Sequence, residues 1–214
     1  MKINIPYINK QEIECIIFDL GGVILDINFD KTIEAFNNLQ IEGLRAEDIF
    51  VNNQTLFLNL ELGTINPSDF ITCFQEIYPA AKKVPTRSIW KAWNALLLSY
   101  RKEKIDLLKK LSKHYKLYLL SNTNLPHRMR FKEMYEDQFG ENFEDLFIRC
   151  FYSDEMHLRK PNLEIYQEVS LAIGIEKSKI LFIDDSKTNI DVAKEYGWHI
   201  YHLTNNESIV DLFI

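Results

Sequence analysis

Short apolar runs alternate with helical patterns through the second half of the chain. The runs at residues 116–120, 147–152, 179–183 and 199–203 have the length and composition of buried strands. The segments between them carry apolar residues at helical spacing. Strands and helices that alternate in this way form a parallel sheet with helices on both faces, so the pattern predicts an α/β fold.

The predicted helices of this half have defined apolar faces. These faces are formed by Ile105, Leu108 and Leu111, by Ile165, Val169, Ala172 and Ile173, and by Ile190 and Ala193. Gly174 and Gly197 directly follow two of these helices. We therefore expect each glycine to end its helix in the left-handed conformation.

Residues 28–100 interrupt the alternation and have a helical pattern instead. One apolar face is shared by Ile89, Trp93, Leu96, Leu97 and Tyr100. Residues 69–77 form a second candidate helix. Because this block lies between the first strand and the rest of the sheet, we expect it to act as a lid. Trp90 and Trp93 are expected to pack in the core of the block rather than to contact a ligand.

Carboxylates follow two of the predicted strands directly. The apolar run at residues 16–18 leads into Asp19, and the run at residues 180–183 leads into Asp184 and Asp185. Neighbouring buried carboxylates repel each other unless a cation compensates them. Ligands of open α/β sheets bind beyond the C-terminal ends of the strands. The pairing therefore predicts a divalent-metal site at this edge of the sheet.

Two further polar residues fit the same site. Ser121 follows the strand predicted at residues 116–120, and Lys160 precedes a predicted helix. Taken alone, Ser121 has the position of an ordinary helix cap and Lys160 that of a surface lysine. Their order along the chain, together with Asp19 and Asp184, indicates a single constellation at the strand ends.

Composition limits the classes of partner. The chain has 214 residues and a formal net charge of −6, which argues against nucleic acid, since phosphate backbones favour a clustered basic surface. No segment approaches the ~20 apolar residues that span a bilayer, and the N-terminal segment lacks the pattern of a signal peptide. The three cysteines have no metal or redox spacing, so we expect free thiols in a reducing cytoplasm.

Four motifs resemble those of the haloacid dehalogenase superfamily, whose members are mostly phosphatases. They are residues 18–24 (FDLGGVI), residues 120–124 (LSNTN), Arg159-Lys160-Pro161, and Asp184-Asp185-Ser186 with Asn189. The resemblance covers essentially the whole chain. It implies a Rossmann-like parallel-sheet core formed by residues 1–27 and 101–214, with an inserted α-helical cap domain at residues 28–100.

The resemblance also implies roles for the motif residues. Asp19 would be the nucleophile that forms an aspartyl-phosphate. Mg²⁺ would be held by the Asp19 carboxylate, the Gly21 carbonyl group and Asp185, with Asp184 beside it. The phosphoryl oxygens would be bound by the Ser121 hydroxyl, the Asn122 amide and Lys160.

Gly21 is a departure from the pattern of the superfamily. Most of its phosphatases carry a second aspartate at this position, which protonates the leaving group and then activates water. The metal ligand here is a backbone carbonyl, so the metal site is compatible with glycine. General acid–base catalysis, typically worth about 10²–10⁴ in rate, would be lost. Sugar-phosphate phosphatases of the α-D-glucose-1-phosphate type resemble this chain in carrying glycine there.

Two other positions concern proton transfer and orientation. Asn189 is a candidate to orient Asp184 or Asp185. His157 stands where relatives usually have glycine, and it is either a proton-transfer residue of the site or a surface loop histidine. The sequence thus predicts a Mg²⁺-dependent phosphatase that acts on a small phosphorylated metabolite such as a sugar phosphate. The alternatives are a 2-haloacid dehalogenase and a catalytically impaired relative with a binding or regulatory role.

Overall fold

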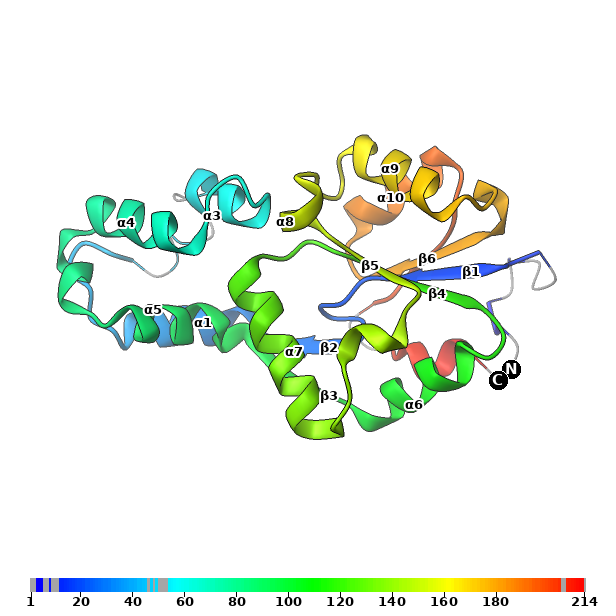
Figure 1. Cartoon of the computed structure of the whole chain (residues 1–214), viewed down its shortest axis with the longest axis horizontal. Helices are drawn as coiled ribbons and strands as arrows, with labels where there is room; N and C mark the ends of the chain where they lie inside the picture. Colours follow the sequence, from blue (N-terminus) through cyan, green and yellow to red (C-terminus); the bar gives the residue numbers. More distant parts are fainter. Residues whose placement is uncertain are drawn as a thin grey trace.

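The core is a parallel β-sheet. The computed structural model describes residues 3–5, 8, 12–45, 47, 49, 54–204 and 207–213. The sheet has five strands in the order β5-β4-β1-β6-β7 (Figure 1). The strands are β1 (Cys15–Phe18), β4 (Lys116–Ser121), β5 (Arg149–Tyr152), β6 (Ile180–Asp184) and β7 (His199–His202). Every neighbouring pair is parallel, which confirms the predicted α/β fold.

Helices cover both faces of this sheet because its strands are apolar on both sides. Ile16 and Phe18 pack on one face against α6 (Lys102–Leu111) and α7 (Leu125–Phe139). Cys15 and Ile17 pack on the other face, against α9 (Leu163–Ile173) and α10 (Lys187–Tyr196). The period of two along a strand therefore divides β1 between two hydrophobic cores.

Shorter helices complete the core. They are α8 (Ser153–Met156), η3 (Phe143–Leu146), η4 (Lys177–Lys179) and η5 (Ile209–Leu212). Gly174 (φ 67°) and Gly197 (φ 107°) end α9 and α10 in the left-handed conformation, as predicted. Ala172, in contrast, is exposed on α9, so its assignment to the apolar face was wrong. Cys15 is buried and Cys150 half-buried, both as free thiols.

The inserted block is helical and has a hydrophobic core of its own. Its helices are α1 (Phe29–Asn37), α3 (Gln54–Glu61), α4 (Pro67–Ile77), η1 (Pro79–Lys83), α5 (Thr86–Trp93) and η2 (Asn94–Leu96). Aromatic rings fill the space between them: Phe57 contacts Phe70 and Trp93, and Phe70 contacts Trp90. Figure 1 shows the block projecting beyond the carboxyl ends of the strands. Both tryptophans pack in this core, as predicted, and Trp93 also stacks on His127 of α7, outside the block.

A two-stranded ribbon joins the block to the core and corrects one prediction. Leu97 and Tyr100 belong to β3 (Leu97–Tyr100), which pairs antiparallel with β2 (Leu25–Ile27), and not to a helix. The apolar residues at 97–100 have helical spacing, but their pairing with β2 favours a strand. Leu25 pairs with Tyr100, whose buried hydroxyl donates to the Phe131 carbonyl oxygen. Long-range pairing of this kind overrides a short local pattern.

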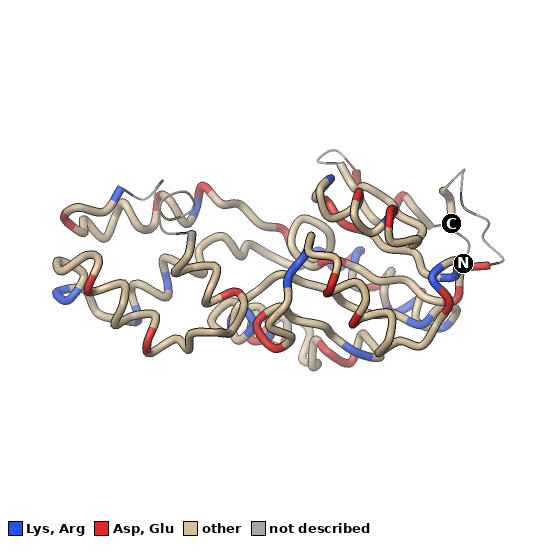
Figure 2. Tube along the Cα trace, turned by 90° about the horizontal axis from the view of Figure 1, so that it is seen from above, with Lys and Arg blue, Asp and Glu red and all other residues tan. Residues whose placement is uncertain are grey.

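Charges of both signs are interspersed along the core and the helical block (Figure 2). None of the helices in the described residues is long and apolar enough to cross a bilayer.

Candidate active site

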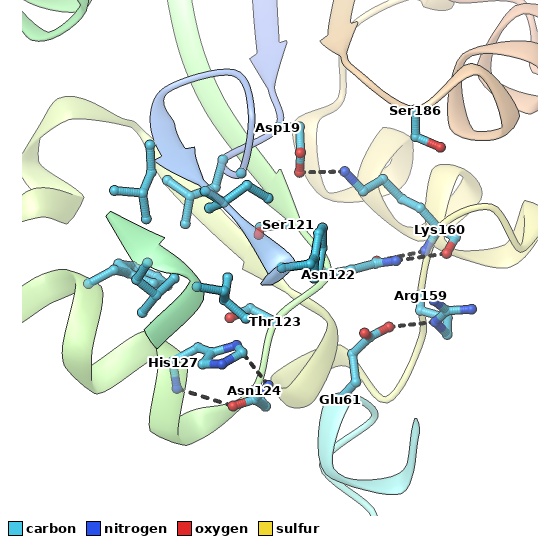
Figure 3. Close-up of a pocket in the computed structure, with 18 of the residues that line it drawn as sticks. Asp19, Glu61, Ser121, Asn122, Thr123, Asn124, His127, Arg159, Lys160 and Ser186 are labelled. Carbon is cyan, nitrogen blue, oxygen red and sulfur yellow. Dashed lines mark hydrogen bonds and ion pairs between the residues drawn. The ribbon is translucent and has the colours of Figure 1, made fainter. Parts of the chain in front are cut away.

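The register of the sheet places two of the predicted carboxylates side by side. Phe18 of β1 pairs with Ile183 of β6, so the residues that follow, Asp19 and Asp184, lie at adjacent strand ends. Lys160, from the loop between α8 and α9, extends to both of them. Its Nζ is 2.7 Å from Asp19 Oδ1 and 2.6 Å from Asp184 Oδ2, and Figure 3 shows the contact with Asp19.

Burial makes these charges depend on one another. The Lys160 side chain is 1% exposed. Burial alone would lower the pKa of Lys160, but Asp184 and Asp19 outweigh that effect and raise it above its usual range. Burial also disfavours the charged form of Asp19 and so raises the pKa of Asp19. The charge of Lys160 opposes this rise, and the charge of Asp184 reinforces it. Additional positive charge at this point would therefore favour the ionised form of Asp19.

The adjacent aspartates differ in what they contact. Asp184 is fully buried, and both of its oxygens are already hydrogen-bonded, by Lys160, the Ser186 backbone N–H and the Asn189 side chain. Asn189 lies 3.0 and 3.1 Å from the two oxygens, which matches the orienting position expected for it. Asp185 is exposed as a whole residue, but its carboxyl group is partly desolvated, and this desolvation together with the charge of Asp184 raises the pKa of Asp185.

Three carboxylates form a group that suits a hard cation. Asp19, Asp184 and Asp185 each offer an oxygen, and these oxygens lie within 4.8 Å of one another. An all-oxygen donor set fits Mg²⁺. Because the oxygens of Asp184 are already engaged, Asp19 and Asp185 are the carboxylates best placed to contact a cation directly.

Gly22 explains how the chain leaves room for Asp185. Its φ is +73°, and a Cβ built on it would lie 2.2 Å from Asp185 Oδ2. Gly21 is less restricted, since it has no left-handed angle and its Cβ would lie 3.0 Å from the Ile27 Cδ1 methyl group. The constraint of backbone conformation therefore falls on Gly22 and not on Gly21.

Ser121 and Asn122 follow β4 and lie beside the lysine. Ser121 is 3% exposed and lines the same cavity as Asp19. The Asn122 side chain donates to the Lys160 carbonyl oxygen (2.8 Å) and accepts from the Lys160 backbone N–H (2.9 Å). This double hydrogen bond fixes the lysine segment against the end of β4 (Figure 3).

His157 lies outside this cavity. It is exposed, has a left-handed φ of 56°, and its Nδ1 lies 2.7 Å from the Leu62 carbonyl oxygen of the helical block. Of its two interpretations, the surface loop histidine agrees with this position, and a role in proton transfer at the site does not.

A cavity of about 690 Å³ opens over the site. Asp19, Ser121, Lys160 and Asp185 line its floor. The helical block contributes an apolar wall of Phe29, Ile49, Phe57, Leu58, Trp93, Leu96 and Leu97. This volume is in the range of small-molecule sites.

Sequence reasoning did not identify several residues of the cavity. Glu61 ends α3 with no motif around it, and Arg159 was noted only as a neighbour of Lys160. His127 and Asn124 lie on the wall as part of a hydrogen-bonded cluster with Trp93. Asn124 belongs to the motif at residues 120–124 but had no role assigned to it. It is the N-cap of α7, and an asparagine directly before a predicted helix could have indicated this position.

Comparison with protein families agrees with the site. A family model described as haloacid dehalogenase-like hydrolase matches residues 13–197. The chain therefore belongs to the haloacid dehalogenase-like hydrolase family and is a hydrolase of that superfamily.

Particular relatives are phosphatases. The D-ribitol-5-phosphate phosphatase of Bacteroides thetaiotaomicron is 30% identical over 90% of this chain and 93% of its own. A sesquiterpene phosphatase of Aspergillus oryzae is 26% identical over 89% of each chain. A Bacteroides thetaiotaomicron enzyme of the same family has been solved in complex with magnesium and inorganic phosphate. Its structure superimposes on this one with a TM-score of 0.87 at 34% sequence identity, and the match covers 94% of this chain and 100% of that chain.

An L-2-haloacid dehalogenase of Xanthobacter autotrophicus shares the fold alone. It is 17% identical with a TM-score of 0.57, over 89% of this chain and 77% of its own. This likeness carries no information about the reaction.

Proposed function

We propose that the protein is a Mg²⁺-dependent phosphatase of small phosphorylated metabolites, with Asp19 as nucleophile. The observation that carries the proposal is the buried Lys160 held between Asp19 and Asp184 at the floor of a cavity, with Asp185 beside them. The phosphatase relatives and the magnesium–phosphate complex of a family member support the same reaction class.

In this mechanism a carboxylate oxygen of Asp19 attacks phosphorus while the bond to the leaving oxygen breaks. Lys160 neutralises charge on the phosphoryl oxygens and keeps Asp19 ionised. Ser121 donates its hydroxyl to a phosphoryl oxygen, and Asn122 contributes its backbone amide because its side chain is engaged with Lys160. Water then attacks the aspartyl-phosphate, which releases inorganic phosphate and regenerates the carboxylate.

Asp19, Asp185 and the Gly21 carbonyl group would hold Mg²⁺, with Asp184 as a neighbour that fixes Lys160. When bound, the ion supplies positive charge to the transferring phosphoryl group. We assign residues 1–27 and 101–214 to the core domain and residues 28–100 to a cap domain that encloses the leaving group.

The direct test combines metal removal with a nucleophile variant. We expect chelation by EDTA to abolish phosphate release from p-nitrophenyl phosphate and Mg²⁺ to restore it. Asp19→Asn should lower kcat by about 10³-fold or more with an unchanged circular dichroism spectrum, because it removes the nucleophile. Full activity in EDTA, or release of chloride from 2-chloropropionate, would instead support the alternative that the protein is a 2-haloacid dehalogenase.

Gly21 predicts how the rate depends on the leaving group. With no acid at this position, kcat should rise steeply as the pKa of the leaving alcohol falls, so aryl phosphates and anomeric sugar phosphates should react faster than alkyl phosphates. Gly21→Asp should accelerate alkyl phosphates most, by about 10²-fold, and a Cβ at this position needs only a small shift of the Ile27 methyl group. A flat dependence on leaving-group pKa in the wild type would mean that another group donates the proton.

A further inference from the structure

An ion pair between the cap and the core lies in the wall of the cavity. Arg159 Nε donates to Glu61 Oε1 at 2.5 Å, and both residues line the cavity that contains Asp19. Glu61 is the last residue of α3, and Arg159 directly precedes Lys160. Figure 3 shows the pair beside the segment that carries the lysine.

The pair retains hydrogen-bonding groups that no described residue uses. Arg159 is engaged only through Nε, so both Nη groups remain as donors, and Glu61 retains Oε2 as an acceptor. Their side chains are 34% and 26% exposed. Arg128 offers a contrast: its two Nη groups are paired with Glu155 and Asp154, and its side chain is 15% exposed.

Backbone contacts hold the pair in place. The Ser153 hydroxyl lies 2.8 Å from the Glu61 carbonyl oxygen, and His157 Nδ1 lies 2.7 Å from the Leu62 carbonyl oxygen. On the other side, the Asn122 side chain fixes the Lys160 backbone next to Arg159. Groups that are positioned before binding lose less entropy when a ligand arrives, so this pair is better suited to recognition than a mobile surface pair.

The surroundings of the pair restrict what it can recognise. Of the described cap residues that line the cavity, Glu61 alone carries a charge, and Phe57, Leu58 and Leu96, which line the same cavity, are apolar. A ligand that fits this wall presents C–H groups to the apolar residues and hydroxyl groups to the pair. Hydroxyls can donate to Glu61 and accept from Arg159 at once.

We infer that Glu61 and Arg159 are specificity-determining residues that bind the hydroxyl groups of a polyol or sugar leaving group. The inference rests on the proposed phosphatase function and adds the substrate class. Hydrogen bonds between charged groups and substrate hydroxyls discriminate strongly, because the analogue without hydroxyls leaves the polar groups unpaired.

The test compares esters that differ only in hydroxyl groups. Ribitol 5-phosphate and n-pentyl phosphate have the same number of carbon atoms, and p-nitrophenyl phosphate reports the chemistry without either. We expect the wild type to prefer ribitol 5-phosphate over pentyl phosphate in kcat/KM. Glu61→Gln and Arg159→Met should each lower kcat/KM for ribitol 5-phosphate by about 10–100-fold, with p-nitrophenyl phosphate within about twofold of wild type.

A matched control is the pair formed by Arg130 and Glu133. Its contact is similar in length at 2.6 Å, but it lies on the exposed surface of α7 and does not line the cavity. Glu133→Gln and Arg130→Met should leave all three rates unchanged.

The outcomes separate the inference from the function on which it rests. Equal losses on all three esters would mean that the pair only fastens the cap, and unchanged rates would mean that it contacts no substrate; either result overturns the inference. Activity on p-nitrophenyl phosphate with a preference for pentyl phosphate would overturn the substrate class alone. Absence of phosphate release from every ester would overturn the proposed function and the substrate class together.

Discussion

The floor of the cavity and its cap wall are built on different physical principles. At the floor, Lys160 lies between Asp19 and Asp184, and the buried charges are acceptable because the lysine compensates the two carboxylates and they compensate the lysine. The cap has a core of aromatic rings that needs no charge, and it meets the α/β core through a few specific contacts. In the proposed mechanism the chemistry is concentrated in this electrostatic unit, whereas the packing of the cap core depends on shape.

This difference predicts how a substitution acts in each region. Removal of the lysine charge at the floor leaves two adjacent carboxylates uncompensated, so stability and activity should fall together. At the cap, a substitution alters packing or a backbone contact, so its effects on stability and on activity can be separated.

Lys160→Met should have the largest effect. It preserves the volume of the side chain but leaves Asp19 and Asp184 adjacent and without their cation. We expect the free energy of unfolding in urea to fall by about 3–5 kcal/mol. Because the lysine also faces the phosphoryl group in the proposed mechanism, kcat should fall by about 10²–10³-fold.

Lys104→Met is the control for this variant. Lys104 is also buried, with a side chain 6% exposed and Nζ 3.1 Å from Asp26, but Asp26 keeps a second partner in Arg101. The loss of stability should therefore be smaller, with kcat unchanged. A Lys160→Met protein as stable as wild type would show that the two carboxylates do not need the lysine.

The carboxylates and the serine of the floor could be predicted from the sequence because they occupy strand ends. Parallel strands bring their carboxyl ends to one edge, so Asp19, Ser121 and Asp184 are placed by the fold itself. The different environments of Asp184 and Asp185 could not be predicted. They depend on the directions in which two consecutive side chains point and on the position of Lys160.

The cap wall could be predicted only in outline. Apolar spacing identified a helical block, but it extended the helix into β3, whose pairing with β2 is a long-range contact. Glu61 and Gly63 contact the segment at residues 153–159, about ninety residues further along the chain. No local pattern signals such a contact.

His127 predicts a pH-dependent link between cap and core. Burial lowers the pKa of its imidazole to about 4, and the hydrogen bond to the Trp93 carbonyl oxygen opposes this only in part. The unfolded chain, with a pKa near ~6.5, binds the proton more readily. The neutral ring thus contributes stability that is complete above about pH 6.5 and is lost as the pH falls towards 4.

The expected contribution is about 3 kcal/mol over this interval. Urea unfolding at pH 7 and pH 4.5 measures it. His127→Gln should remove most of the decrease between the two pH values, whereas His114→Gln, at an exposed position, should retain it. The same decrease in wild type and His127→Gln would assign the pH dependence to other groups.

Gly63→Ala should have the smallest effect and tests the backbone contact of the cap. Gly63 has φ +63°, and a Cβ would lie 2.0 Å from the Asp154 carbonyl oxygen. Gly140 has a similar φ of +70°, but a Cβ built on it has nothing within 4 Å. Gly140→Ala therefore reports the cost of the left-handed backbone without a steric clash. We expect Gly63→Ala to cost about 1–2 kcal/mol more than Gly140→Ala in urea unfolding, because the contacts of Ser153 and His157 are disrupted. It should also raise KM, whereas Gly140→Ala should not. Equal costs would show that the cap segment moves aside freely and that shape does not hold the two regions together.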